Sequence, residues 1–145
     1  MKKEKIITSI IVAIAVVAVF TAANAAFAKI IVIANEDVSV SYLSASELKN
    51  VYLGKKSFWD SDVKIVLAVL VNGSIHQSFL KENVGKTPEQ FKNYWNKILY
   101  TGAGIPPTPL KTEAEMIEYI KKTRGAIGYV DSATPHEGVK VIEIR

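Results

Sequence analysis

Four apolar segments of the chain have the pattern of buried strands. Residues 30–34 form an unbroken apolar run, and residues 64–71 are rich in valine and leucine. Two further segments lie near the C-terminus, at 125–130 and 139–144. Short continuous apolar runs are typical of strands that are buried on both faces of a sheet. Helices are therefore expected on both sides of that sheet.

Four other segments place apolar residues at helical spacing. Three of them open with a capping box, at 44–47, 87–90 and 112–115, in which a hydroxyl and a carboxylate or amide satisfy free N–H groups. Ser74 is predicted to cap the fourth, after Asn72-Gly73 breaks the second strand. The residues predicted to be buried are Leu48, Val51, Tyr52, Ile75, Phe79, Leu80, Val84, Phe91, Tyr94, Trp95, Ile98, Leu99, Met116, Ile117 and Ile120.

The order of these elements is β-α-β-α-α-α-β-β, which predicts the fold class. Helices between apolar strands favour a mixed, mainly parallel sheet covered by helices on both faces, a three-layer α/β architecture. Residues 55–62 between the first helix and the second strand are predicted to form a loop, with Phe58-Trp59 as an aromatic plug.

The first 28 residues have the pattern of a secretion leader. Three lysines near the start precede an apolar stretch at 6–20, and two A-x-A sites follow, ending at Ala25 and Ala28. We expect a signal peptide at 1–28 and a single domain at 29–145. Cleavage after Ala25, or retention of the segment as an anchor, is the alternative, since 6–28 is long enough to cross a bilayer.

Charge and composition exclude several functional classes. The 145-residue chain carries a formal charge of +4, of which the leader contributes three lysines and one glutamate, so +2 remains for the domain. This weak charge does not favour nucleic acid as a partner. The chain has no cysteine, which excludes disulfides and thiolate chemistry. His76 and His136 lack carboxylates at ligand spacing, so neither a metal nor another cofactor is expected, and no nucleophile with its base is apparent.

Several motifs resemble those of one protein family. The segment from Leu43 to Lys55, with Trp59 a few residues on, resembles "L-S-x-x-E-L-x-x-I-F-L-G-K-…-W" of phosphate-type periplasmic substrate-binding proteins. Residues 125–130 are similar to the "G-A-I-G-Y-V" strand of that family, and residues 91–107 resemble the "W-…-F-T-G-…-P-P" stretch of its short, single-lobe branch. The resemblance implies one lobe of a type II periplasmic binding protein.

The resemblance also implies a ligand site. Asn72-Gly73-Ser74 falls where the family has its phosphate-binding "R-x-D-G-S-G-T" turn, so the implied ligand residues are Asn72, Gly73, Ser74, Ile75 and His76. The family's arginine and aspartate are not present at this turn, and the resemblance covers only the second of the two lobes that enclose the anion.

Physical chemistry leaves two interpretations of this turn open. A strand that breaks at Asn72-Gly73 and opens a helix presents free N–H groups at the positive end of the helix dipole, where Ser74 and His76 could add donors. Without the guanidinium, millimolar binding is expected, on the order of 4 kcal/mol. Alternatively, the segment is a plain turn with an N-cap, and His76 is a surface residue.

The expected function is that of a non-enzymatic periplasmic protein that binds phosphate or a similar oxyanion in connection with ABC-type transport. A second copy of the chain, or a partner, could supply the missing wall of the cleft. The alternative is an interaction module that has no small ligand and docks onto a transporter or another envelope protein. Exposed apolar side chains near Phe58-Trp59 or along 105–107 would favour the alternative.

Overall fold

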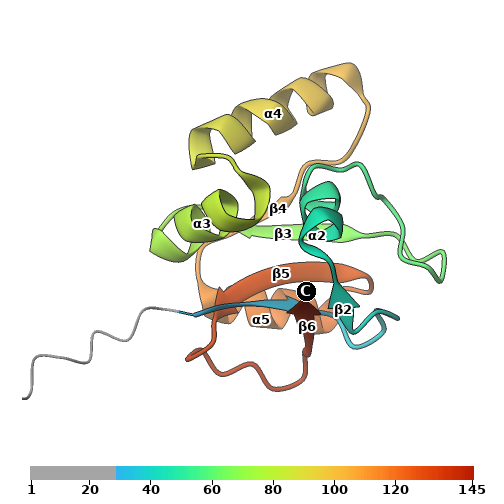
Figure 1. Ribbon diagram of the computed structural model, residues 1–145, viewed down its shortest axis with the longest axis vertical. Coiled ribbons are helices and arrows are strands. Elements are labelled where there is room, and N and C mark those ends of the chain that lie inside the picture. The colour runs from blue at the N-terminus through green and yellow to red at the C-terminus, as the bar shows by residue number, and fades with distance from the viewer. Residues whose placement is uncertain (1–28) are drawn as a thin grey trace, which may run out of the picture.

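The computed structural model describes residues 29–145, which form a six-stranded sheet with helices packed on it (Figure 1). The strand order is β2-β6-β1-β5-β3-β4. β1 runs antiparallel to its neighbours β5 and β6, and the remaining contacts, β2–β6, β3–β5 and β3–β4, are parallel. The mixed, mainly parallel sheet is thus confirmed. The strands are β1 (Ile30–Ala34), β2 (Tyr42–Leu43), β3 (Val66–Leu70), β4 (Thr108–Leu110), β5 (Ala126–Asp131) and β6 (Lys140–Ile144).

Five helical segments connect these strands. They are α2 (Ala45–Tyr52), α3 (Ser74–Phe79), the π-helix η1 (Leu80–Val84), α4 (Pro88–Thr101) and α5 (Glu113–Lys122). α3 continues into η1 without a break, because its C-cap residue keeps right-handed helical dihedrals. In Figure 1, α4 lies beyond the β3–β4 side of the sheet, away from β1 and β6. Within the part of the chain that the structure describes, no helix is long and apolar enough to span a membrane.

Two neighbouring residues of β5 show that helices cover both faces of the sheet. Successive side chains of a strand point to opposite faces. A Cβ at Gly128 would run into Met116 and Ile120 of α5, so α5 packs directly on this strand. The next residue, Tyr129, stacks on Phe79 at the end of α3, with ring centroids 3.8 Å apart. The three layers predicted from the sequence are therefore present.

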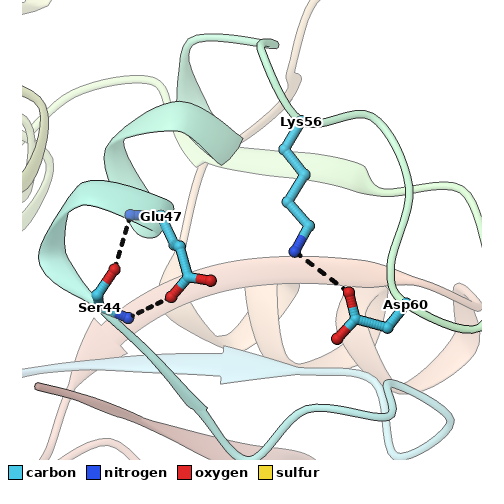
Figure 2. Close-up of polar contacts among 4 residues, drawn as sticks. All are labelled: Ser44, Glu47, Lys56 and Asp60. Atoms are coloured by element: carbon cyan, nitrogen blue, oxygen red, sulfur yellow. Dashed lines mark hydrogen bonds and ion pairs between the residues drawn. The ribbon is translucent and has the colours of Figure 1, made fainter.

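The predicted caps form, with one difference. The Ser44 hydroxyl accepts from the Glu47 N–H (3.1 Å), while the Glu47 carboxylate accepts from the Ser44 N–H (2.8 Å; Figure 2). Thr87 and Gln90 form the same reciprocal pair at the start of α4. At α5, Thr112 accepts from the Glu115 N–H, but the Glu115 carboxylate accepts from the N–H of Lys111 instead of Thr112. The third box is therefore only half formed.

The core follows most of the predicted apolar faces, but Val71 and Val141, in two of the predicted strands, are 47% and 46% exposed. Leu99 was expected in the buried stripe of α4 but is 57% exposed, because it lies near the end of the helix, beyond the part that packs on the core. Of the expected aromatic plug, only Trp59 is buried, and its indole N–H donates to the carbonyl of Gly125 (2.9 Å). Phe58 remains 55% exposed.

Two strands were not predicted. β2 has two residues, too few for any periodicity, and it pairs only with β6 at the sheet edge. β4 reads Thr-Pro-Leu, and proline is tolerated here because β4 is the other edge strand. The predicted signal peptide at 1–28 lies outside the described residues.

Candidate anion-binding turn after strand β3

The predicted ligand turn lies at the carboxyl end of β3, on the surface. Leu70 of β3 pairs with Leu110 of β4, and the next N–H, that of Val71, donates to the Leu110 carbonyl (3.0 Å). The chain then leaves the sheet, and Val71, Asn72, Gly73 and Ser74 are all exposed. This is the edge at which open α/β sheets generally bind ligands.

The start of α3 differs from the expected N-cap. Ser74 was expected to cap the helix, but it is the first helical residue, and Gly73 is the N-cap. Gly73 has a φ of 94°, a left-handed conformation that glycine adopts without strain, and it has no side chain with which to cap. The first intrahelical bond runs from the Gln77 N–H to the Gly73 carbonyl (3.1 Å). The N–H groups of Ser74, Ile75 and His76 therefore precede the helical hydrogen-bond ladder.

The imidazole of His76 lies in the core, so the alternative prediction that His76 is a surface residue is wrong. The residue is 5% exposed, and its Nδ1 lies 2.5 Å from the Tyr129 hydroxyl oxygen. That oxygen also accepts from the N–H of Leu70 (3.1 Å). Burial lowers the pKa of His76 and raises that of Tyr129, so both groups are neutral at pH 7. The Tyr129 hydroxyl therefore donates its proton to Nδ1 of His76 while its oxygen accepts from Leu70, which leaves the imidazole proton on Nε2.

His76 can therefore contribute its backbone N–H to the turn, but its Nδ1 is already bonded to Tyr129. The bond joins residues 53 positions apart, so nothing in the local sequence around His76 indicates it. The buried pair of His76 and Tyr129 also holds the residue before the turn, because the N–H of Leu70, the last residue of β3, donates to the same hydroxyl.

α5 begins at the same end of the parallel strands as α3, but carboxylates already lie at its start. Glu113 Oε1 accepts from the Asp131 N–H (2.5 Å) and from the Thr134 hydroxyl (3.1 Å). Glu115 accepts from the N–H of Lys111 (2.9 Å). By contrast, the first turn of α3 contains no acidic residue. A small anion at this edge would therefore meet uncompensated N–H groups at α3 and negative charge at α5.

One basic residue near the turn, Lys111, has no signal in the local sequence. Lys111 follows Leu110 directly and is exposed, and Leu110 is bonded to Val71 just before the turn. The pairing of β3 with β4 places this lysine in the neighbourhood of the turn, and β4 has too weak a pattern to be predicted. Among residues 29–145, no group of three or more His, Cys, Asp or Glu side chains is arranged to hold a metal ion.

Comparison with known proteins shows the fold but no sequence family. No family model matches the chain, and no curated protein matches it. Among solved structures, it is similar to a protein described as a phosphate ABC transporter substrate-binding protein with bound phosphate, from Clostridium perfringens (TM-score 0.64, 19% identity). It is also similar to PstS from Borrelia burgdorferi (0.63, 17%) and to an ABC-type phosphate transport receptor from Vibrio cholerae (0.55, 14%).

These matches cover 81% of this chain but only 45%, 47% and 46% of the three structures, respectively. The chain thus spans less than half the length of each. At such low identity the similarity establishes the shared fold, and it leaves the ligand of this chain to be inferred from its own residues.

Proposed function

We propose that this chain, which shares its fold with part of the phosphate ABC transporter substrate-binding proteins, binds phosphate or a similar oxyanion at Asn72–His76 and serves ABC-type transport in the periplasm. The predicted leader would deliver it there. The observation that carries the proposal is the start of α3. Three N–H groups precede its helical ladder, directly after the exposed residues 71–74 at the carboxyl end of β3, and the first turn contains no carboxylate. Backbone N–H groups at a helix start are a recurring phosphate site.

The expected affinity is low. The turn offers backbone N–H groups, the Ser74 hydroxyl and the charge of Lys111, but no guanidinium for a bidentate contact. The anion stays partly in water, where each contact is worth less than in a closed cleft. We expect a millimolar dissociation constant, about 4 kcal/mol of binding free energy. A second copy of the chain or a transporter that covers the turn would strengthen binding by excluding water.

Amide NMR during a phosphate titration tests the proposal, with sulfate as a second oxyanion. We expect saturable shifts confined to residues 73–77 and their neighbours, with half-saturation in the millimolar range. No change up to tens of millimolar phosphate would overturn the proposal.

A charge substitution sharpens this test. Ser74→Asp places a carboxylate at the start of α3, as Glu113 does in α5, and should abolish the phosphate-dependent shifts through repulsion. Ser46→Asp makes the same change at an exposed position of α2 and should leave the titration unaltered. Equal phosphate binding by the Ser74→Asp variant would contradict the assignment of the turn.

A second candidate function, docking onto an envelope protein, is favoured by exposed apolar side chains around the end of α4. Leu99, Tyr100 and Ile105 are 57%, 94% and 68% exposed. Pull-down from envelope extracts tests this candidate when the chain is compared with a Tyr100→Ser/Ile105→Ser variant. A partner retained by the chain and lost from the variant would support docking, and equal recovery by both would count against it.

A further inference from the structure

A second candidate site lies at the amino end of β3, whereas the candidate anion-binding turn follows its carboxyl end. A cavity of about 480 Å³ opens between α4, the end of α2 and the first residues of β3. It is lined at Lys64–Leu67, where β3 begins, whereas Asn72 follows the strand's other end. With roughly 3.3 Å of rise per residue, the five-residue strand separates the two places by about 15 Å. The volume is within the range of small-molecule sites, about 300–1,000 Å³.

The walls of the cavity are predominantly apolar. Val51 of α2, Leu67 of β3, and Trp95 and Ile98 of α4 line it, and Ile105 from the connection between α4 and β4 lies at its edge. Ile105 is 68% exposed. An apolar ligand body would remove this surface from water.

Four of the five neutral polar side chains that line the cavity have hydrogen-bond partners, the exception being Ser57. The Tyr94 hydroxyl donates to the carbonyl of Leu53 (2.5 Å), and the Trp95 indole N–H donates to that of Tyr52 (3.1 Å). These two bonds also satisfy carbonyls at the C-terminal end of α2, which would otherwise repel a negative charge. On the far side, the hydroxyls of Thr108 and Tyr119 bond to each other (3.0 Å).

The remaining polar side chains are the Ser57 hydroxyl and three ammonium groups, from Lys55, Lys56 and Lys64, and no acidic residue lines the cavity. Lys56 is partly compensated by Asp60 (Nζ to Oδ1, 3.5 Å; Figure 2). Lys55 and Lys64 are exposed and make no ion pair with any residue from 29 to 145. The cavity thus combines an apolar interior with a positively charged rim.

From this combination we infer that the cavity binds an amphipathic monoanion, an apolar body that carries one carboxylate. The body would lie against Trp95 and Ile98, and the head would face Lys55 and Lys64. A free phosphate has no apolar part and gains nothing from these walls, so this site takes a different class of ligand from the turn. The inference stands independently of the proposed function.

NMR of the purified protein with three probes tests the inference. Octanoate has both the body and the charge, 1-octanol has only the body, and acetate has only the charge. The indole N–H signal of Trp95 reports on the cavity, and that of Trp59, which is buried elsewhere, is an internal control. We expect a saturable shift of the Trp95 signal with octanoate, at least about tenfold weaker binding of octanol and acetate, and no shift of the Trp59 signal.

A matched pair of variants tests the role of the lysines. Lys55→Glu/Lys64→Glu reverses both rim charges and should weaken octanoate binding at least tenfold. Lys81→Glu/Lys92→Glu changes the net charge by the same amount at two exposed lysines that do not line the cavity, and should bind octanoate as the unmodified chain does.

Each contrary result would overturn the inference. No Trp95 shift with octanoate would exclude the cavity as a site, and equal binding of octanol would exclude the role of charge. Shifts of both indole signals together would indicate nonspecific association. A Trp95 shift produced by phosphate alone would show that the cavity does not require an apolar ligand body, and would contradict the claim that it takes a different class of ligand from the turn.

Discussion

At the residue scale, the Tyr129 side chain connects β3 and α3, the two elements on either side of the candidate turn. Its hydroxyl joins the Leu70 N–H and the His76 ring, and its own ring stacks on Phe79 with the two planes 8° apart. Beside it, the buried Tyr52 hydroxyl lies 3.3 Å from the carbonyl of Ala68. A polar network within an aromatic cluster is stable only while each member keeps its partner.

Tyr129→Phe is expected to lower the free energy of unfolding by about 1–3 kcal/mol, because it leaves the buried Leu70 N–H and His76 Nδ1 without a partner. Urea denaturation measures the change. Tyr100→Phe removes a hydroxyl from a residue that is 94% exposed and should stay within about 0.5 kcal/mol. If the two variants unfold alike, the buried hydroxyl does not stabilise the fold as described.

The pH dependence of stability should contain a contribution from His76. Burial lowers its pKa below the ordinary 6.5, so the unfolded chain takes up a proton at a higher pH than the folded one. The contribution is complete above pH 6.5 and is lost as the pH falls through the lowered pKa of the folded state. Urea denaturation at several pH values below 6.5 is therefore expected to show falling stability.

The His76→Gln variant should lose that part of the decline in stability, since its side chain does not titrate. His136→Gln is the matched control, because His136 is only partly buried and bonds locally to the carbonyl of Thr134 (2.7 Å). An unchanged pH profile in the His76→Gln variant would show that the decline comes from other groups.

At the scale of elements, the helix starts are defined by short-range signals. Ser44→Ala should lower the free energy of unfolding by about 1 kcal/mol, because the N–H of Glu47 loses its acceptor and the capping box opens. The control is Ser46→Ala, on the same helix and exposed, where alanine favours the helix slightly. Urea denaturation of both variants checks this prediction. A Ser44→Ala variant as stable as the Ser46→Ala variant would mean that water replaces the cap.

The elements that the sequence predicts are those with a local physical cause. Ser44, Thr87 and Thr112 each cap a helix because a hydroxyl three residues before a free N–H can reach it. The π-helical turn that follows Phe79 has no such signal, because the apolar spacing of its buried residues also fits an α-helix. The strand Thr108–Leu110 exists through its pairing with β3, which no local pattern encodes.

At the scale of the whole molecule, the position of the candidate turn was predictable but its surroundings were not. Asn72-Gly73 after an apolar run predicts a strand that breaks into a helix, as observed. Whether His76 faces solvent depends on Tyr129, and the proximity of Lys111 depends on a strand pairing across 40 residues of chain. The cavity is assembled from α2, β3, α4 and α5, so no single segment indicates it.

The reversed central strand has a consequence for the order in which this fold can assemble. Among residues 29–145, β1 is the first strand, yet both of its partners, β5 and β6, are the last two, and Ile30 pairs with Asp131 about a hundred residues later. A chain that emerges from the ribosome N-terminus first therefore carries β1 unpaired until β5 and β6 have been synthesised, about a hundred residues later. Such long loops must close before their contacts form, which slows folding. The sheet therefore cannot be completed before β5 and β6 are available, which lengthens the interval in which the polypeptide remains unfolded.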